Sequence, residues 1–139
     1  MMQARPPARR RTRAYTGVME DVYELYSRGM ALLEAGDFNS ATIPLGKAAA
    51  LEPDKTSVRE ALGRACFRSR QYERAAAEFE AVVDRAPTND YALFCLGRSL
   101  MELGRNGDAR RPLALAACLR PERRDYRIYR DRARRAAAA

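Results

Sequence analysis

The sequence predicts an all-α fold of three consecutive helical hairpins followed by a seventh helix. The main observation is that three sets of residues recur unchanged at a spacing of 34, which indicates an internal repeat. In addition, a proline closes each repeat, and apolar residues within each repeat follow helical spacing. The recurring residues are Gly29, Gly63 and Gly97, then Ala41, Ala75 and Ala109, and then Pro53, Pro87 and Pro121.

Each repeat divides into two helices joined by a short turn. The prolines mark the links between repeats, because proline cannot continue a helix and pushes the preceding residue toward extended geometry. Gly36 and Gly104 fit the turns of the first and third repeats, and Arg70 and Gln71 occupy that place in the second. The predicted helices span 22–35 and 38–51, 56–69 and 72–85, and 90–103 and 106–119. The repeat region extends over 18–121, with units at 22–55, 56–89 and 90–123.

Helix starts are predicted from polar residues that can cap the first backbone amides. Thr56, Ser57, Thr88 and Asn89 have suitable side chains, and Ser57 with Glu60 has the spacing of a capping box.

Two prolines fall inside the predicted second helices. Pro44 and Pro112 are separated by twice the repeat length. Because proline has no backbone N–H, we expect these helices either to begin late, so that the missing donor belongs to the unpaired first turn, or to kink.

The recurring glycine needs a physical explanation, since glycine inside a helix costs about 1 kcal/mol relative to alanine. Gly63 lies in the middle of a predicted helix. A residue without a side chain lets two antiparallel helices approach closely, and the packing gained then offsets the lost backbone entropy. Gly29, Gly63 and Gly97 are therefore predicted to face the second helix of their own repeats.

This arrangement resembles the tetratricopeptide repeat family, whose 34-residue helix–turn–helix unit has the same pattern of glycine, alanine, aromatic and closing proline. The resemblance covers residues 22–121. It implies a right-handed superhelical solenoid in which the first helices line a concave groove. The sequence departs from the family at a column usually filled by tryptophan, which here holds Leu25, Arg59 and Leu93, and at Arg28, which replaces a leucine.

The two ends of the chain carry most of its net charge of +8. Residues 1–17 hold five arginines and no acid and are predicted to be a disordered basic arm. Residues 122–139 hold seven arginines against three acids, and they are predicted to form the seventh, capping helix with an Ala-rich end. Its packing residues would be Tyr126, Ile128, Tyr129 and Ala133.

The sequence lacks the residues that most catalytic sites require. Without any histidine, neither a Ser-His-Asp triad nor the usual zinc patterns can form. No run approaches the roughly 18 apolar residues of a membrane-spanning helix. Cys66, Cys95 and Cys118 are far apart and odd in number, which indicates reduced thiols in the cytoplasm. The sequence predicts a non-enzyme without a cofactor or a metal.

Each first helix carries a second stripe of residues in addition to the one that packs on its partner helix. Together these stripes predict a groove that binds a peptide or helix with apolar anchors and acidic groups, as a non-catalytic adaptor or scaffold would. The groove residues are Tyr23, Tyr26, Met30, Glu60, Arg64, Phe67, Tyr91, Phe94, Arg98 and Met101. The alternative is that these aromatics pack against loops, the N-terminal arm or the capping helix.

Two other functions remain open at this stage. The Arg-rich ends, 1–17 and 123–135, could bind nucleic acid with steep salt dependence, or the aromatic stripe could join two copies in a homodimer. A family subtype clamps a C-terminal carboxylate with Lys and Asn, but this clamp is absent here. The matching positions hold Tyr26, Met30, Ala61, Tyr91 and Cys95.

Overall fold

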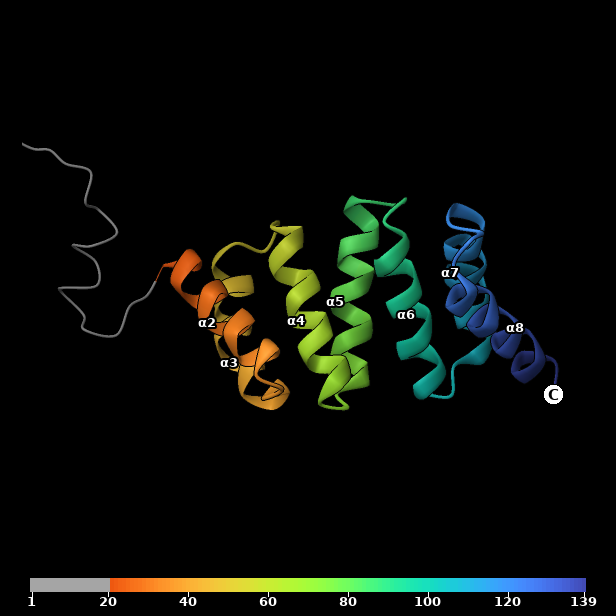
Figure 1. Cartoon of the computed structure of the whole chain (residues 1–139), viewed down its shortest axis with the longest axis horizontal. Helices are drawn as coiled ribbons and strands as arrows, with labels where there is room; N and C mark the ends of the chain where they lie inside the picture. The colour runs from red at the N-terminus through yellow and green to blue at the C-terminus, as the bar shows by residue number, and fades with distance from the viewer. Residues whose placement is uncertain (1–20) are drawn as a thin grey trace, which may run out of the picture.

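The computed structural model describes residues 21–139, and within that range it contains seven α-helices and no strand (Figure 1). The all-α prediction is confirmed. The second helices match their predicted bounds, and the first helices each end one residue earlier than predicted. Labelled as in Figure 1, the helices are α2 (Val22–Glu34), α3 (Phe38–Leu51), α4 (Thr56–Arg68), α5 (Tyr72–Arg85), α6 (Asp90–Glu102), α7 (Asn106–Leu119) and α8 (Arg124–Ala138).

The helices form a two-layered row of hairpins, with α2 and α3 at one end and α7 and α8 at the other (Figure 1). Every helix packs on its neighbours in the chain. The backbones of the first helices α2, α4 and α6, together with that of α8, also approach one another in sequence, whereas those of α3, α5 and α7 stay farther apart. The first helices and α8 therefore make the inner, concave layer of the solenoid, and the second helices make the outer layer.

The recurring glycines lie where the two helices of each hairpin meet. A Cβ atom added at Gly29 would come within 2.4 Å of Leu45, and one added at Gly97 would come within 2.3 Å of Leu113. At Gly63 it would lie 2.9 Å from the ring of Phe79. Carbon atoms cannot approach so closely, so only glycine allows these contacts. The explanation predicted for the glycines is confirmed.

The turns within the hairpins require left-handed backbone geometry. Gly36 has a φ angle of +83° and Gly104 one of +78°. Arg70 fills the same place in the second repeat with a φ of +65°, a conformation that disfavours any residue with a side chain. The second turn is therefore less favourable than the other two, as its sequence indicates.

The predicted N-caps are only partly correct. The side chain of Asn89 caps α6 by accepting a hydrogen bond of 3.0 Å from the amide of Ala92. By contrast, α4 begins at Thr56 itself, with Lys55 in the capping position and no side-chain cap. The prediction of Thr56 and Ser57 as caps is therefore wrong, because α4 begins before either residue could stand in the capping position. Thr88 is not a cap either, because Asn89 holds that position at α6. Glu60 accepts from the Asn89 amide group at 3.3 Å and forms no capping box.

A capping box is present at a different helix, α2. The Asp21 side chain accepts from the amide of Glu24 at 2.8 Å, and the Glu24 carboxylate accepts from the amide of Asp21 at 3.3 Å. This reciprocal pair fixes where the first described helix begins.

The prolines do not delay the second helices. Helix α3 runs from Phe38 through Pro44, and α7 runs from Asn106 through Pro112, so the expectation of a late start is wrong. Both prolines are buried. Apolar residues on both sides of each proline belong to the hairpin core, and this packing holds the helix together despite one missing hydrogen bond.

Helix α8 covers the open face of the third repeat, which confirms the predicted capping helix. Tyr126 is fully buried, its ring stacks on Phe94 at a centroid distance of 4.5 Å, and its hydroxyl donates to Asp90 at 2.7 Å. Ala133 is fully buried as well. Because α8 begins 34 residues after α6, it takes the place of a fourth first helix. The predicted arm at residues 1–17 lies outside the described residues.

Candidate functional site

A pocket of about 460 Å³ lies on the inner face of the solenoid, and we call it the inner groove. Its lining comes from the end of α2 and the following turn, from α4 and α6, and from Phe38 of α3 and Phe79 of α5. The structure brings together five of the predicted site residues here: Arg64, Phe67, Tyr91, Phe94 and Arg98. Lining residues that the prediction missed include Leu33, Phe38, Arg68 and Cys95.

Arg98 lies among three aromatic rings. Its guanidinium carbon is 4.5 Å from the centroid of Tyr129, 5.0 Å from that of Phe67 and 5.8 Å from that of Phe94. All three distances are within the range of cation–π attraction. The side chain is therefore held in place by α4, α6 and the capping helix at once.

The inner groove is basic. Arg64 and Arg98 form no ion pair with any residue in the described range, and Arg68 lies over the ring of Phe38 at 4.2 Å. Among the described residues that line the pocket, Glu34 is the only acid. Three guanidinium groups thus surround an aromatic lining, and each retains donors for a carboxylate.

Phe94 is a wall of the groove and offers little contact surface, because it is only 6% exposed. Tyr126 stacks on one side of it, and the Tyr129 ring packs edge-on at 5.5 Å. Packing against the capping helix, the alternative considered for the aromatic stripe, therefore describes this residue. Tyr91 differs, being 38% exposed beside the same pocket.

The uncharged lining groups stay uncharged in neutral solution. Burial raises the pKa of the Cys95 thiol to about 11, and burial also raises the pKa of the Tyr91 hydroxyl. The charge of the inner groove near neutral pH therefore comes from its arginines and from Glu34.

The remaining predicted site residues lie outside this pocket. Tyr23 and Tyr26 line a separate pocket with Leu51 at the N-terminal end of the described solenoid. Met30 and Met101 are half-buried against the core, and the half-buried Glu60 holds Asn89.

The capping helix pairs several of its arginines locally. Arg123 contacts Asp125 at 2.8 Å, while Arg130 and Arg134 contact Asp131 at 3.0 and 3.6 Å. Surface pairs of this kind add little stability, but they reduce the positive charge offered to a polyanion. These local ion pairs therefore disfavour nucleic-acid binding through α8.

Large apolar side chains are exposed at the N-terminal end of the described helices. Tyr23 is 74% exposed, Ile43 60% and Leu51 53%. These are the residues that self-association of the solenoid would cover.

Two negative findings concern the described residues. Within 21–139, no three side chains of histidine, cysteine, aspartate or glutamate come together as ligands for a metal ion. The helices of this range also lack the length and apolar character needed to cross a membrane.

The repeat, the paired helices and the inner layer together define a tetratricopeptide-type solenoid. The model of the tetratricopeptide repeat family matches residues 26–90 and 60–128, and the chain belongs to this family. Its members are non-catalytic modules for protein interaction. No match was found among curated protein sequences.

Solved structures show the same fold. The MamA MSR-1 structure is 26% identical, with a TM-score of 0.76 over 81% of this chain and 65% of that chain. MamA from Desulfovibrio magneticus RS-1 is 24% identical, with a TM-score of 0.74 over 85% and 72%. The first TPR domain of Spaghetti (RPAP3), solved with the HSP90 peptide SRMEEVD, is 16% identical, with a TM-score of 0.78 over 86% and 94%.

Proposed function

We propose that this protein is a non-catalytic adaptor whose inner groove binds a segment of another protein that carries apolar anchors and acidic groups. The observation that carries the proposal is the state of Arg98, which lies within 6 Å of three rings while making no ion pair in the described range. Arg64 lines the same pocket and also makes none. A partner carboxylate would complete both groups with paired hydrogen bonds.

Preorganisation is the physical basis of this binding. The two helices of each hairpin pack closely at the glycines, and contacts with Phe67 and Tyr129 orient Arg98 before any partner binds. The protein therefore loses little conformational entropy on binding, and the partner bears most of the ordering cost. Tyr91 and Phe67 supply aromatic area for an apolar anchor next to the charges.

Charge reversal in the groove tests the proposal. Full-length protein carrying Arg64→Glu and Arg98→Glu should lose the partners that wild-type protein captures from its native cell extract. The matched control is Arg110→Glu with Arg124→Glu, because both of these arginines are exposed and lie outside the groove. If both double variants retain the same partners, with wild-type helical content by circular dichroism, the inner groove is not the binding site.

Nucleic-acid binding through the chain ends remains the alternative. Deleting the C-terminal end would remove Tyr126 and uncover Phe94, on which it stacks, so glutamine should replace arginine instead. Replacing the five arginines of 1–17 together with Arg124 and Arg135 changes only exposed side chains of α8. The adaptor proposal expects partner binding to survive these changes. The alternative expects the variant to lose binding, and it expects the affinity of the wild-type protein to fall steeply as salt is added.

A further inference from the structure

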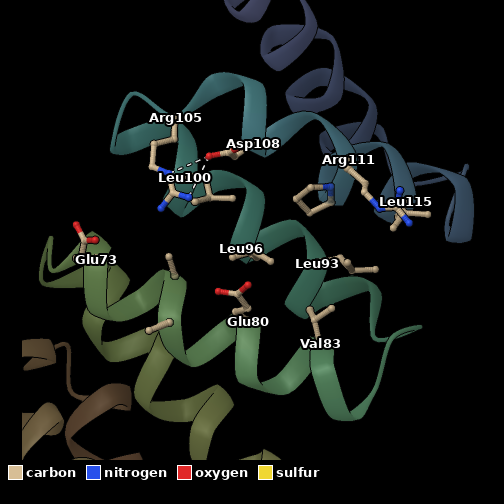
Figure 2. A pocket seen from close by; sticks show the side chains of 13 residues that line it. Glu73, Glu80, Val83, Leu93, Leu96, Leu100, Arg105, Asp108, Arg111 and Leu115 are labelled. Carbon is tan, nitrogen blue, oxygen red and sulfur yellow. Dashed lines mark hydrogen bonds and ion pairs between the residues drawn. The ribbon is translucent and has the colours of Figure 1, made fainter.

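We propose a second binding surface on the outer face, a groove between α5 and α7 that takes a helical segment of another protein with an apolar stripe flanked by arginine or lysine. We call it the α5–α7 groove. Figure 2 shows this pocket, which has a volume of about 490 Å³. It shares no lining residue with the inner groove, so the inference stands apart from the proposed function.

The floor of the α5–α7 groove is apolar. Leu93, Leu96 and Leu100 of α6 lie along it at the spacing of one helix face, and because they are only 2%, 9% and 7% exposed they close the floor, while the contact surface comes from the borders. Val83 borders it from α5, and Leu115 borders it from α7 with 39% of its surface exposed. Because the backbones of α5 and α7 stay apart, a ridge of side chains from a further helix can enter between them, as in helix-in-groove recognition.

The charges on the two walls differ. On the α5 wall, Glu73 and Glu80 are exposed and have no ion-pair partner within the described range. On the α7 wall, Arg105 is already paired with Asp108 at 3.0 Å (Figure 2). Arg111 lies beside Leu115 (Figure 2). An arginine or lysine of a partner would therefore form ion pairs on the α5 wall, with these two acids.

The equivalent groove one repeat earlier, between α3 and α5, shows that an arginine fits there. Arg59 lies 34 residues before Leu93, and Glu78 lies 34 residues before Pro112. The Arg59 guanidinium donates to Glu78 at 2.8 Å and to the carbonyl of Pro53 at 2.9 Å. In this α3–α5 groove the chain fills the space between the outer helices with its own basic side chain.

Further side chains cross the α3–α5 groove. The Gln71 amide donates to Asn39 at 3.3 Å, and Arg74 donates to Gln71 at 2.9 Å while reaching to within 3.7 Å of a Cβ built on Gly46. Asn39 and Gly46 correspond to Glu73 and Glu80 one repeat later. The α5–α7 groove thus has two acids where the α3–α5 groove has neutral residues. Its own arginines, Arg105 and Arg111, border it from the α7 side, and neither forms an ion pair with Glu73 or Glu80 in the described range. A basic side chain from a partner would therefore lie in the α5–α7 groove as Arg59 lies in the α3–α5 groove.

The test uses a defined probe on the full-length protein. The probe is a designed peptide of about 18 residues, long enough to form helix. It carries leucines on one face and arginines along the one flank that would face the α5 wall. Its counterpart has glutamates in place of the arginines. With isotope-labelled protein, the arginine peptide should shift the amide resonances of α5 and α7 around Ala77, Val83 and Leu115, and the shifts should saturate.

Variants of the acidic wall decide the outcome. Glu73→Arg with Glu80→Arg should weaken the arginine peptide at least about tenfold. The matched control, Asp84→Arg with Glu102→Arg, makes the same charge change on exposed residues outside the groove and should leave the affinity within about twofold. The proposal is wrong if both variants lose affinity equally, if the shifts lie in the inner groove, if the glutamate peptide binds the α5–α7 groove as well, or if no shift saturates.

Discussion

The α3–α5 groove and the α5–α7 groove are built from the same repeat, yet one is filled and the other is open. Arg59, Gln71 and Arg74 of the chain itself occupy the first groove, whereas leucines line the floor of the second. The hairpins that form the two grooves are alike, since in each one the glycine of the first helix packs against a large side chain of the second helix. In this solenoid the repeat fixes the backbone, and a few outer side chains decide whether a surface is closed or available for binding.

Breaking the shared framework should have the largest effect. Gly97→Ala places a Cβ 2.3 Å from Leu113, and we expect a loss of about 1–3 kcal/mol in the free energy of unfolding from overpacking. Gly46→Ala is the matched control, because its Cβ would meet nothing closer than Arg74 at 3.7 Å, and it should gain about 0.5–1 kcal/mol from helix propensity. Urea unfolding measures both. Equal effects would show that the glycine contacts do not hold the hairpins together.

Opening the filled groove should have a smaller effect. The Arg59 and Glu78 side chains are 25% and 15% exposed, so Arg59→Leu leaves a largely buried carboxylate without its partner. We expect a loss of about 1–2 kcal/mol. Adding Glu78→Leu removes the orphaned charge and should recover most of it. A double variant as unstable as the single one would mean that Arg59 acts through packing alone.

The capping contact should contribute somewhat less. Tyr126→Phe removes the hydroxyl that donates to Asp90 but keeps the ring stacked on Phe94. We expect a loss of about 1 kcal/mol in chemical unfolding, the net value of one hydrogen bond. Tyr126→Ala removes the ring as well and should cost about twice as much, and similar losses in both variants would contradict a role for stacking.

Thiol reactivity should distinguish the surfaces without changing stability. Burial raises the pKa of the Cys66 thiol beneath the α3–α5 groove and the pKa of Cys95 to about 11, whereas Cys118 is exposed. Because the thiolate is the reactive form, at pH 8 an alkylating reagent should modify Cys118 first. Modification of Cys95 should accelerate as the pH rises toward 11. Mass spectrometry follows each site, and modification of Cys66 first would contradict the packing.

The sequence was sufficient to predict the arrangement of the helices. A spacing of 34 placed the hairpins, and the cost of glycine inside a helix pointed to close contacts at Gly29, Gly63 and Gly97. Both signals occur in each of the three repeats, so an error of a residue or two in one helix boundary does not change the predicted arrangement. The start of α4 at Thr56 was predicted, but its capping residue was not, because capping depends on one residue of register.

The candidate sites were predicted less completely, because burial depends on what packs above a residue. Phe94 has the spacing of a groove residue, but Tyr126 and Tyr129 of α8 cover it. The α5–α7 groove was missed because Leu93, Leu96 and Leu100 read only as packing positions. The one sequence signal for it is the change from Arg59 to Leu93 between equivalent positions, which has meaning only once Arg59 is seen to fill its own groove.

The central claim is that the two faces of this solenoid select opposite charges independently, and titration of both designed peptides against the same variants tests it most directly. Arg64→Glu with Arg98→Glu should abolish binding of the glutamate peptide and spare the arginine peptide, while Glu73→Arg with Glu80→Arg should do the reverse. If either variant weakens both peptides equally, the two surfaces are not separate sites and the account is wrong.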